Sequence, residues 1–271
     1  MSIRARLVAT GAVVGVISLV ALLAPWLTPY DPIMQLDLAG GRVQPPSWSH
    51  PLGTDLFSRD LLSRLLHGAR FSLGIAALAV CTAAVLGTAA GLLAGWFGGW
   101  IDTILMRLVD AGLAIPRVFA ALLVLALWDA AGPLGLIVVL GVTGWFGTAR
   151  LVRAEVLSLR HRDFVLALEA LGATPRRILT QHIVPHVLPP VIVTATIGVG
   201  QVILLESGLA FLGVGLRPPA PSWGSIIREG TTALSSAPWI ALSAGVALVV
   251  TVTALSALGD ALRDRLDPRM R

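Results

Sequence analysis

Long uncharged hydrophobic stretches dominate the chain and are separated by short segments that carry the arginines. Uncharged runs occupy residues 7–30, 71–101, 130–149, 187–205 and 231–259. A helix needs about 20 mostly apolar residues to cross a bilayer. A sixth segment, residues 103–128, is interrupted by three charged side chains and keeps a short apolar core at 118–128. The pattern predicts an all-α membrane protein with six transmembrane helices, of which the third is the weakest.

Composition supports a membrane protein and excludes two other classes. Of the 271 residues, 56% are hydrophobic and 13% are charged, with a mean hydropathy of +0.84. Globular proteins carry about a quarter charged residues, and disordered chains need low hydrophobicity and high charge. The lone cysteine, Cys81, supports no disulfide framework and is expected to be a small buried residue.

All 20 basic residues are arginine, and the sequence contains no lysine. A P-loop needs a lysine to reach the nucleotide phosphates, so this chain is not itself a P-loop ATPase. Schiff-base chemistry is excluded for the same reason. The sequence pI of about 11.1 does not indicate nucleic-acid binding, because the arginines lie between hydrophobic runs rather than on one soluble face.

The distribution of arginines predicts the orientation. With both termini in the cytoplasm, twelve arginines lie inside and six outside, in agreement with the positive-inside rule. The first span lacks a small-residue cleavage site, so a signal peptide is not favoured. The expected organisation is a cytoplasmic N-terminus (1–6), a first span (7–27), an external segment with an amphipathic helix (28–70), a core of five spans (71–265) and a cytoplasmic tail (266–271). Within that core lie a cytoplasmic loop (150–186) and an external segment (213–230).

Small and polar residues within the spans add two expectations. Gly87, Gly91, Gly95 and Gly99 are four residues apart, and such a stripe allows close approach of another helix. Glu206 lies within the fifth span, where a carboxylate is costly unless it is paired or faces a wet cavity. Its role is open between a structural pair and the translocation path, and Gln201 is a second candidate for that path.

The loop at 150–186 predicts a helix, a break, a short helix, a tight turn and another helix. Asp163 can cap a short helix that begins at Phe164, and Gly172 can end it. Thr174 followed by Pro175 is typical of the start of the next helix.

The short helix at 164–171 is almost entirely apolar, with Phe164, Ala167, Leu168 and Leu171 on one face. A cytoplasmic apolar helix must be covered. Either it folds back on its own bundle, or it lies in the groove of a partner protein.

This loop resembles the EAA loop of ABC importer permeases, the coupling helix that docks on an ATPase subunit. The residues that carry the resemblance to the peptide and nickel subfamily are Phe164, Val165, Ala167, Ala170, Leu171, Gly172, Ala173, Arg177, Ile178, His182, Ile183, Pro185, Leu188, Pro189 and Pro190. The chain departs from the family at Leu166, where the family often has glutamate, and carries its glutamate at Glu169 instead.

Two further stretches, 50–73 and 206–230, resemble signatures of the DppC/OppC-like half of the same permease pairs. The resemblance covers about residues 20–265. In the first stretch, Thr54 or Asp55 can cap a leucine-rich amphipathic helix. In the second, Pro218, Pro219 and Pro221 exclude a regular helix, so this backbone must be buried in protein or line a cavity.

The resemblance implies a non-catalytic permease subunit of an ATP-driven peptide importer in the bacterial inner membrane. Implied partners are a second, DppB/OppB-like permease, two ATPases that bind ATP and Mg²⁺, an external solute-binding protein and membrane lipid; no cofactor, metal or nucleic acid is expected on this chain. The implied coupling residues are Asp163, Phe164, Val165, Ala167, Leu168, Ala170, Leu171, Gly172, Ala173, Thr174 and Pro175. Candidates for an external gate or binding-protein contact are Asp55, Arg59, Asp60, Pro218, Pro219 and Trp223, and simple structural covering of the bundle is the alternative for both stretches.

Other functions remain as alternatives. Nickel, glutathione and other small-solute importers share the motifs, so the solute stays open. An ATP-independent secondary transporter would be expected to show inverted repeats with matched broken helices, which six spans with one unmatched cytoplasmic helix fit poorly. His182 and His186 are spaced i, i+4, but Pro185 lies between them and metal binding is not favoured. No nucleophile-elbow motif is present.

Overall fold

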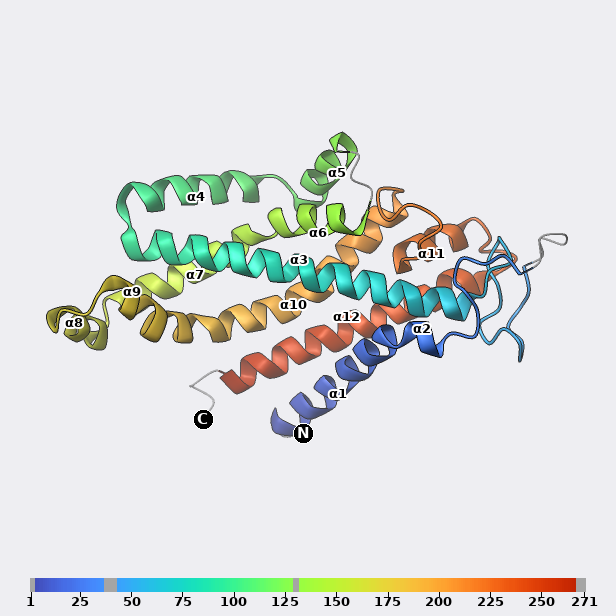
Figure 1. The fold of residues 1–271 in the computed structure, drawn as a ribbon, viewed down its shortest axis with the longest axis horizontal. Coiled ribbons are helices and arrows are strands. Elements are labelled where there is room, and N and C mark those ends of the chain that lie inside the picture. Colours follow the sequence, from blue (N-terminus) through green and yellow to red (C-terminus); the bar gives the residue numbers. More distant parts are fainter. Residues whose placement is uncertain (1–2, 37–42, 129–131, 267–271) are drawn as a thin grey trace.

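The computed structural model describes residues 3–36, 43–128 and 132–266, and these residues are almost entirely helical. In chain order the elements are α1 (Ile3–Leu22), α2 (Ala24–Leu27), α3 (Leu61–Phe97), α4 (Gly99–Ala114), α5 (Arg117–Leu127), α6 (Pro133–Val142), α7 (Trp145–Arg160), α8 (Asp163–Ala170), α9 (Pro175–Ile178), the π-helical turn η1 (Leu179–Ile183), α10 (Val184–Phe211), α11 (Trp223–Thr231) and α12 (Pro238–Leu266). Figure 1 shows an elongated bundle in which α3, α10 and α12 run most of its length. The predicted all-α fold is confirmed.

Five helical segments in the described part of the chain are long and apolar enough to cross a membrane, and a bent pair makes a possible sixth. The bent pair is α4 and α5, which meet at 90°, and this is the weak third span of the sequence pattern. The bend lies at Ile115 and Pro116, where Ile115 adopts extended backbone. A proline disfavours helical backbone in the residue before it, so the break follows directly from the sequence.

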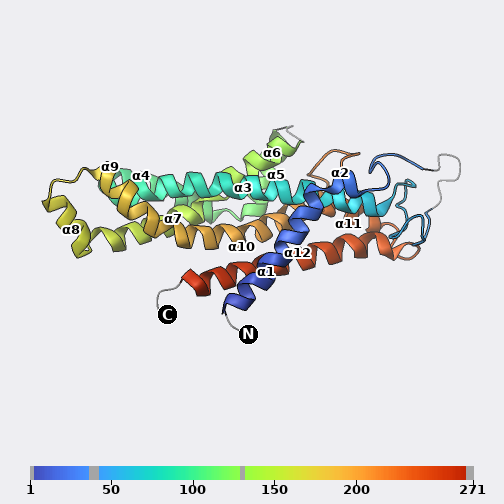
Figure 2. The ribbon, with the colours of Figure 1, turned by 60° about the horizontal axis from the view of Figure 1, so that its bottom comes forward.

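The two ends of the bundle differ in structure. Helix α8 lies at one end, whereas the segment before α3 and helix α11 lie at the other (Figures 1 and 2). Helix α1 leads toward the α11 end and α12 leads back from it, so the start of α1 and the end of α12 both lie on the side of the spans that faces α8. The arginine-based prediction places this side in the cytoplasm.

The glycine stripe of α3 is a contact surface for α7. A Cβ atom on Gly87, Gly91 or Gly95 would lie 2.6–2.8 Å from the side chain of Thr148, Val152 or Val156. Because glycine has no Cβ atom at these three positions, helices α3 and α7 can pack in direct contact, as predicted. Gly99 does not belong to the stripe, because α3 ends at Phe97 and Gly99, with a positive φ of 56°, is the first residue of α4.

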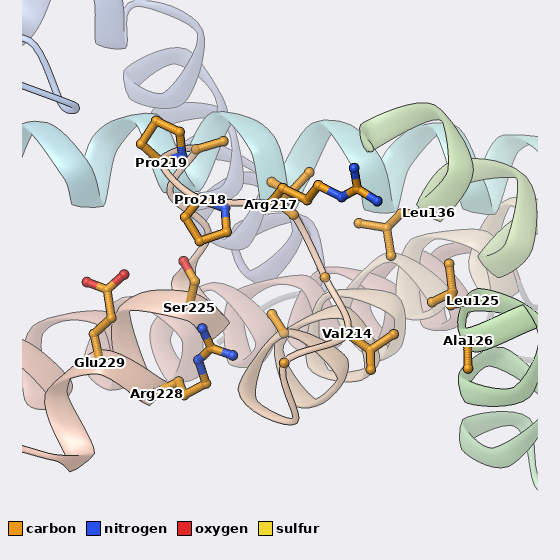
Figure 3. Close-up of a pocket in the computed structure, with 15 residues that line it drawn as sticks. Leu125, Ala126, Leu136, Val214, Arg217, Pro218, Pro219, Ser225, Arg228 and Glu229 are labelled. Carbon is orange, nitrogen blue, oxygen red and sulfur yellow. The ribbon is translucent and has the colours of Figure 1, made fainter. Parts of the chain in front are cut away.

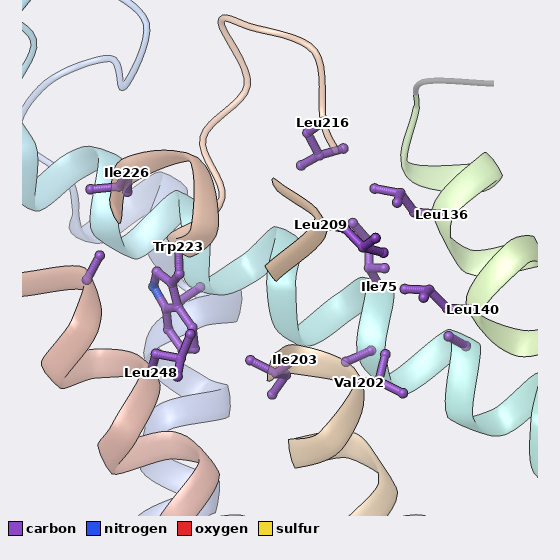
Figure 4. Packing of buried hydrophobic residues seen from close by; sticks show 14 of the residues in the cluster. Ile75, Leu136, Leu140, Val202, Ile203, Leu209, Leu216, Trp223, Ile226 and Leu248 are labelled. Carbon is purple, nitrogen blue, oxygen red and sulfur yellow. The ribbon is translucent and has the colours of Figure 1, made fainter. Parts of the chain in front are cut away.

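The main hydrophobic core lies between α3, α10, α11 and α12, with α6 at its edge (Figure 4). Trp223 at the start of α11 is 2% exposed and packs near Leu248 of α12, while Ile203 of α10 lies beneath it. Apolar packing thus fixes α11 against α3, α10 and α12 at the end of the bundle opposite to α8.

Two expectations about this half of the chain are wrong. The leucine-rich segment after Asp55 is not a separate surface helix, because α3 begins at Leu61, with Asp60 as its N-cap, and continues unbroken to Phe97. Leu61 is buried in the core, and Leu56 and Leu65 pack against it. Cys81 is exposed on α3 and not buried, since it lies on the face opposite to the core, where lipid or another subunit can cover it.

Candidate functional site

Helix α8 starts without the predicted cap. Its N-cap residue is Arg162, which makes no capping bond with its side chain, and Asp163 is the first helical residue. The expectation that Asp163 is the N-cap is therefore wrong by one position. Its carboxylate still lies in the first turn, where negative charge interacts favourably with the helix dipole.

The end of α8 is a tight turn built on Gly172. This residue has φ of +79°, a conformation that costs little only for glycine. The Gly172 N–H donates to the carbonyl of Glu169 at 2.9 Å, and the Ala173 N–H donates to that of Leu168 at 3.0 Å. This pair of bonds is a Schellman motif, and it confirms the predicted role of Gly172.

The next helix begins as the sequence predicts. The hydroxyl of Thr174 accepts a hydrogen bond from the backbone N–H of Arg177 at 3.4 Å, and Pro175 is the first residue of α9. Helix α8 thus follows α7 directly and is joined to α9 by a short, hydrogen-bonded turn.

The two faces of α8 differ in burial. Val165 is fully buried and Leu168 is half-buried in a cluster that includes Val156, Ile178 and Ile183. This face joins α8 to its own bundle. Leu168 therefore does not share an exposed face with Ala167 and Leu171, although the sequence groups the three on one face.

The other face of α8 is unusually apolar for an exposed surface. Leu171 is 83% exposed and Leu166 is 49% exposed, and Ala167 and Ala170 lie beside them. Phe164 is partly exposed and stacks on His186, with ring centroids 5.9 Å apart. An apolar ridge of this kind, presented at the end of the bundle, is the form that a helix-in-groove contact requires.

A buried network of charges occupies the opposite end of the bundle. The carboxylate of Asp55 accepts a hydrogen bond from Arg59 Nε at 2.7 Å and a second from Arg64. Arg59 and Arg64 both also donate to Glu229 of α11, with Nη2 of Arg59 at 3.0 Å and Nη1 of Arg64 at 2.5 Å. The network ties the segment before α3, the first turn of α3 and α11 together.

Burial decides the role of the three charged candidates in this region. Asp55 and Asp60 are fully buried and Arg59 is 6% exposed. Asp60 accepts from the backbone N–H of Ser63 at 2.8 Å and lies 2.9 Å from Nδ1 of His50. These side chains face one another instead of an external partner, so in this conformation they brace the outer end of the bundle and do not form a contact surface.

We expect Arg64→Gln to destabilise the outer end strongly. Arg64 is 1% exposed, and its removal leaves Asp55 and Glu229 short of a compensating charge, which costs about 3–5 kcal/mol for a buried pair. The thermal unfolding midpoint of the purified complex should fall clearly. Arg70→Gln, at an exposed position of the same helix, is the control, and equal midpoints for the two variants would contradict the bracing role.

The remaining external candidates lie in an irregular loop and at the start of α11. Helix α10 ends at Phe211 and α11 begins at Trp223, so the prolines interrupt the helix as predicted. Pro218 and Pro219 line a cavity of about 290 Å³ together with Arg217, Arg228 and neighbouring apolar residues (Figure 3). Trp223 instead points into the core, and its indole N–H donates to the carbonyl of Leu65 at 3.1 Å.

The two polar candidates in the fifth span have different environments. Glu206 is fully buried, and its carboxylate accepts a hydrogen bond from Ser72 of α3 at 3.0 Å. Ser72 also accepts from the backbone N–H of Trp223 at 3.4 Å, so Glu206 supports the junction of α3, α10 and α11. Gln201 is exposed on α10, which leaves it available to a partner subunit or to the translocation path.

Two members of the charge network were not among the sequence candidates. Arg64 follows Arg59 in the first signature, but nothing local distinguishes it from the other arginines of the external segment. Glu229 contacts Arg59 across 170 positions of sequence, and no spacing rule connects residues that far apart. Only the packing of α11 on α3 reveals this pair.

Comparison with known proteins agrees with this geometry. The family described as "Binding-protein-dependent transport system inner membrane component" matches residues 87–271. The dipeptide transport system permease protein DppC of Alkalihalophilus pseudofirmus is 39% identical over 254 residues, which cover 93% of this chain and 82% of that protein. The glutathione transport system permease protein GsiD of Pectobacterium atrosepticum is 35% identical over 264 residues, covering 97% and 87% of the two chains.

A solved structure shares the fold. A chain of the MetNI methionine ABC transporter, in an inward-facing conformation, aligns with a TM-score of 0.63 and 20% sequence identity, and the match covers 76% of this chain and 98% of that one. The family match extends over more than half of the sequence, and the relatives match over nearly all of it. This chain therefore belongs to the family of inner membrane components of binding-protein-dependent transport systems, and is a multi-pass protein of the bacterial inner membrane.

Proposed function

We propose that this chain is one of two permease subunits of an ATP-driven importer of short peptides. The observation that carries the proposal is the apolar outer face of α8, held by a Schellman turn at the end of the bundle, in a chain whose similar relatives include dipeptide permeases. Glutathione is itself a tripeptide, so the likeness to a glutathione permease points to the same chemical class of solute.

The proposed assembly contains four further proteins. A second, homologous permease of the DppB/OppB type completes the pathway, two ATPases bind beneath α8, and an external solute-binding protein delivers the peptide. ATP and Mg²⁺ bind to the ATPases, and this chain is not catalytic. When the ATPases close, the groove that holds α8 moves, and the rigid ends of α8 pass this movement to α7 and α10.

A cysteine crosslink tests the contact with the ATPase. Ala167→Cys, in a Cys81→Ala background that removes the exposed native thiol, places a cysteine on the outer face of α8. With a bismaleimide in native membranes, we expect a covalent adduct with a P-loop ATPase, and we expect ATP plus vanadate to change its yield.

Val165→Cys is the matched control, because Val165 lies two positions away on the same helix and is fully buried against the bundle. It should give no adduct. Free labelling of Ala167→Cys in the assembled complex without capture of an ATPase would contradict the proposal. A second assay, peptide uptake into proteoliposomes by this chain alone, separates the alternative: only a secondary transporter should carry solute without the ATPases.

A further inference from the structure

The cavity at the external end combines an apolar floor with basic side chains. It encloses about 290 Å³ between the loop after α10, helix α11 and the tips of α5 and α6. Leu125, Leu136, Val214 and Leu216 supply apolar surface. Figure 3 shows Arg228 reaching from α11 toward the loop and Arg217 reaching from the loop toward Leu136. The cavity therefore offers a ligand both apolar and charged contacts.

One basic side chain at the cavity has no partner among the described residues. The charged residues in the described lining are Arg217, Arg228 and Glu229. Glu229 is already engaged by Arg59 and Arg64, at 3.0 Å and 2.5 Å. The side chain of Arg228 forms no hydrogen bond or ion pair with any residue that the structure describes. The cavity therefore presents at least one guanidinium group that a ligand can use, beside a carboxylate whose charge is neutralised elsewhere.

We infer that this cavity is a carboxylate-binding site in which Arg228 receives the carboxylate and the leucine-lined floor receives an adjoining apolar group. Guanidinium groups bind carboxylates by paired, charge-assisted hydrogen bonds. The volume lies at the lower end of the range for ligand sites, which starts at about 300 Å³, so it fits the end of a peptide rather than a large solute. The inference rests on the proposed peptide-import function and deepens it.

Two sources can supply such a carboxylate, namely the C-terminus of the transported peptide or an acidic side chain of the protein that delivers it. The cavity lies at the end of the bundle opposite to α8 (Figures 1 and 3), where either would approach. Because both present the same group to Arg228, the experiment must separate them.

A cysteine reporter measures occupancy in the assembled transporter. Ala126 is exposed on α5 and lines the cavity, so Ala126→Cys in the Cys81→Ala background reports on it without touching the arginines. Each reagent's rate is divided by its rate with a free thiol in solution, and all rates below are compared on this scale. We expect a sulfonate-bearing thiosulfonate to react faster than its trimethylammonium counterpart. A free dipeptide such as Ala-Leu should slow the reaction roughly tenfold, whereas its C-terminal amide should not, as one charge-assisted contact is lost.

Arg228→Gln should abolish both the preference for the anionic reagent and the protection by peptide, and Arg228→Lys should retain part of each. Arg70→Gln, an exposed arginine that does not line the cavity, is the control and should change neither. Protection by the free peptide acid assigns the carboxylate to the solute. Protection only by ligand-free binding protein, lost in Arg228→Gln, assigns it to the delivery protein and equally supports the site.

Equal rates for the two reagents, with no protection by either source, would overturn the inference. ATP-dependent peptide uptake by the same preparation keeps that failure distinct from failure of the proposed function. If the complex takes up peptide but neither source protects the introduced cysteine, the carboxylate site is refuted and the proposed function is not. Absence of peptide uptake in a folded, ATP-hydrolysing complex refutes the proposed solute, whatever the reporter shows.

Discussion

Gly172→Val should uncouple ATP hydrolysis from transport. A Cβ at this position meets no atom within 4 Å, so the substitution does not clash, and its whole effect arises from the backbone φ of +79°. Left-handed backbone costs a residue other than glycine roughly 1–2 kcal/mol, and a β-branched side chain adds to this. That is a factor of about 5–30 in the equilibrium between the native turn and a displaced one.

Because the Schellman bonds of Gly172 and Ala173 fix the end of α8, their loss separates the helix from α9. Peptide uptake per ATP hydrolysed should fall by about tenfold in proteoliposomes, while the complex still assembles and hydrolyses ATP.

Gly147→Val is the matched control for this variant. Gly147 is exposed on α7, has no atom within 4 Å of a built Cβ, and has no positive φ. It should keep the wild-type ratio of uptake to hydrolysis. Normal coupling in Gly172→Val would show that the turn does not transmit movement and would remove the main support for α8 as the coupling element.

Gly91→Val should prevent the chain from folding into a stable bundle. A Cβ on Gly91 would lie 2.6 Å from the carbonyl oxygen of Ala149 and 2.6 Å from Cβ of Val152. The obstacle includes backbone, so no side-chain rotation relieves it, and α7 must move away from α3. Overpacking of this kind costs about 1–3 kcal/mol or more. The amount of protein in the membrane and its thermal stability should both fall sharply.

Gly74→Val separates this clash from the general effect of valine in a helix. Gly74 lies on the same helix α3, and a Cβ there meets no atom within 4 Å. Its expression and stability should stay close to wild type. If Gly91→Val were as stable as Gly74→Val, the close contact of α3 with α7 would not be needed for folding.

The sequence predicted the ends of elements better than the faces of helices. Gly172, Thr174 and Pro175 each act through their own backbone or that of near neighbours. Their roles could therefore be predicted from local spacing. The inward position of Leu168 could not be predicted in this way. Apolar residues surround the short helix α8, so a partner groove and the chain's own bundle fit the sequence equally well. Only the contact with Val156, Ile178 and Ile183 shows which residues turn inward.

The same distinction holds at the external end. The family resemblance of the stretch 50–73 made Asp55, Arg59 and Asp60 candidates for an external gate or a binding-protein contact. Their actual partners include Glu229, 170 positions from Arg59, and this long-range contact turns the cluster into a buried brace. The cavity beside it joins two regions that are distant in sequence, residues 125–136 and 210–229, so no linear pattern could reveal it.

By itself, the sequence determined the class of molecule: hydrophobic runs long enough to cross a bilayer, arginines concentrated on one side, and proline and glycine at the breaks. These properties depend on the free energy of transferring a segment from water to lipid and on local backbone preferences. Both are set within each segment, independently of the rest of the chain. The tertiary structure decided which face of α8 is free, which charges are buried, and where Arg228 meets a leucine-lined cavity. Each of these depends on how distant helices pack against one another, and that packing exists only once the bundle has formed.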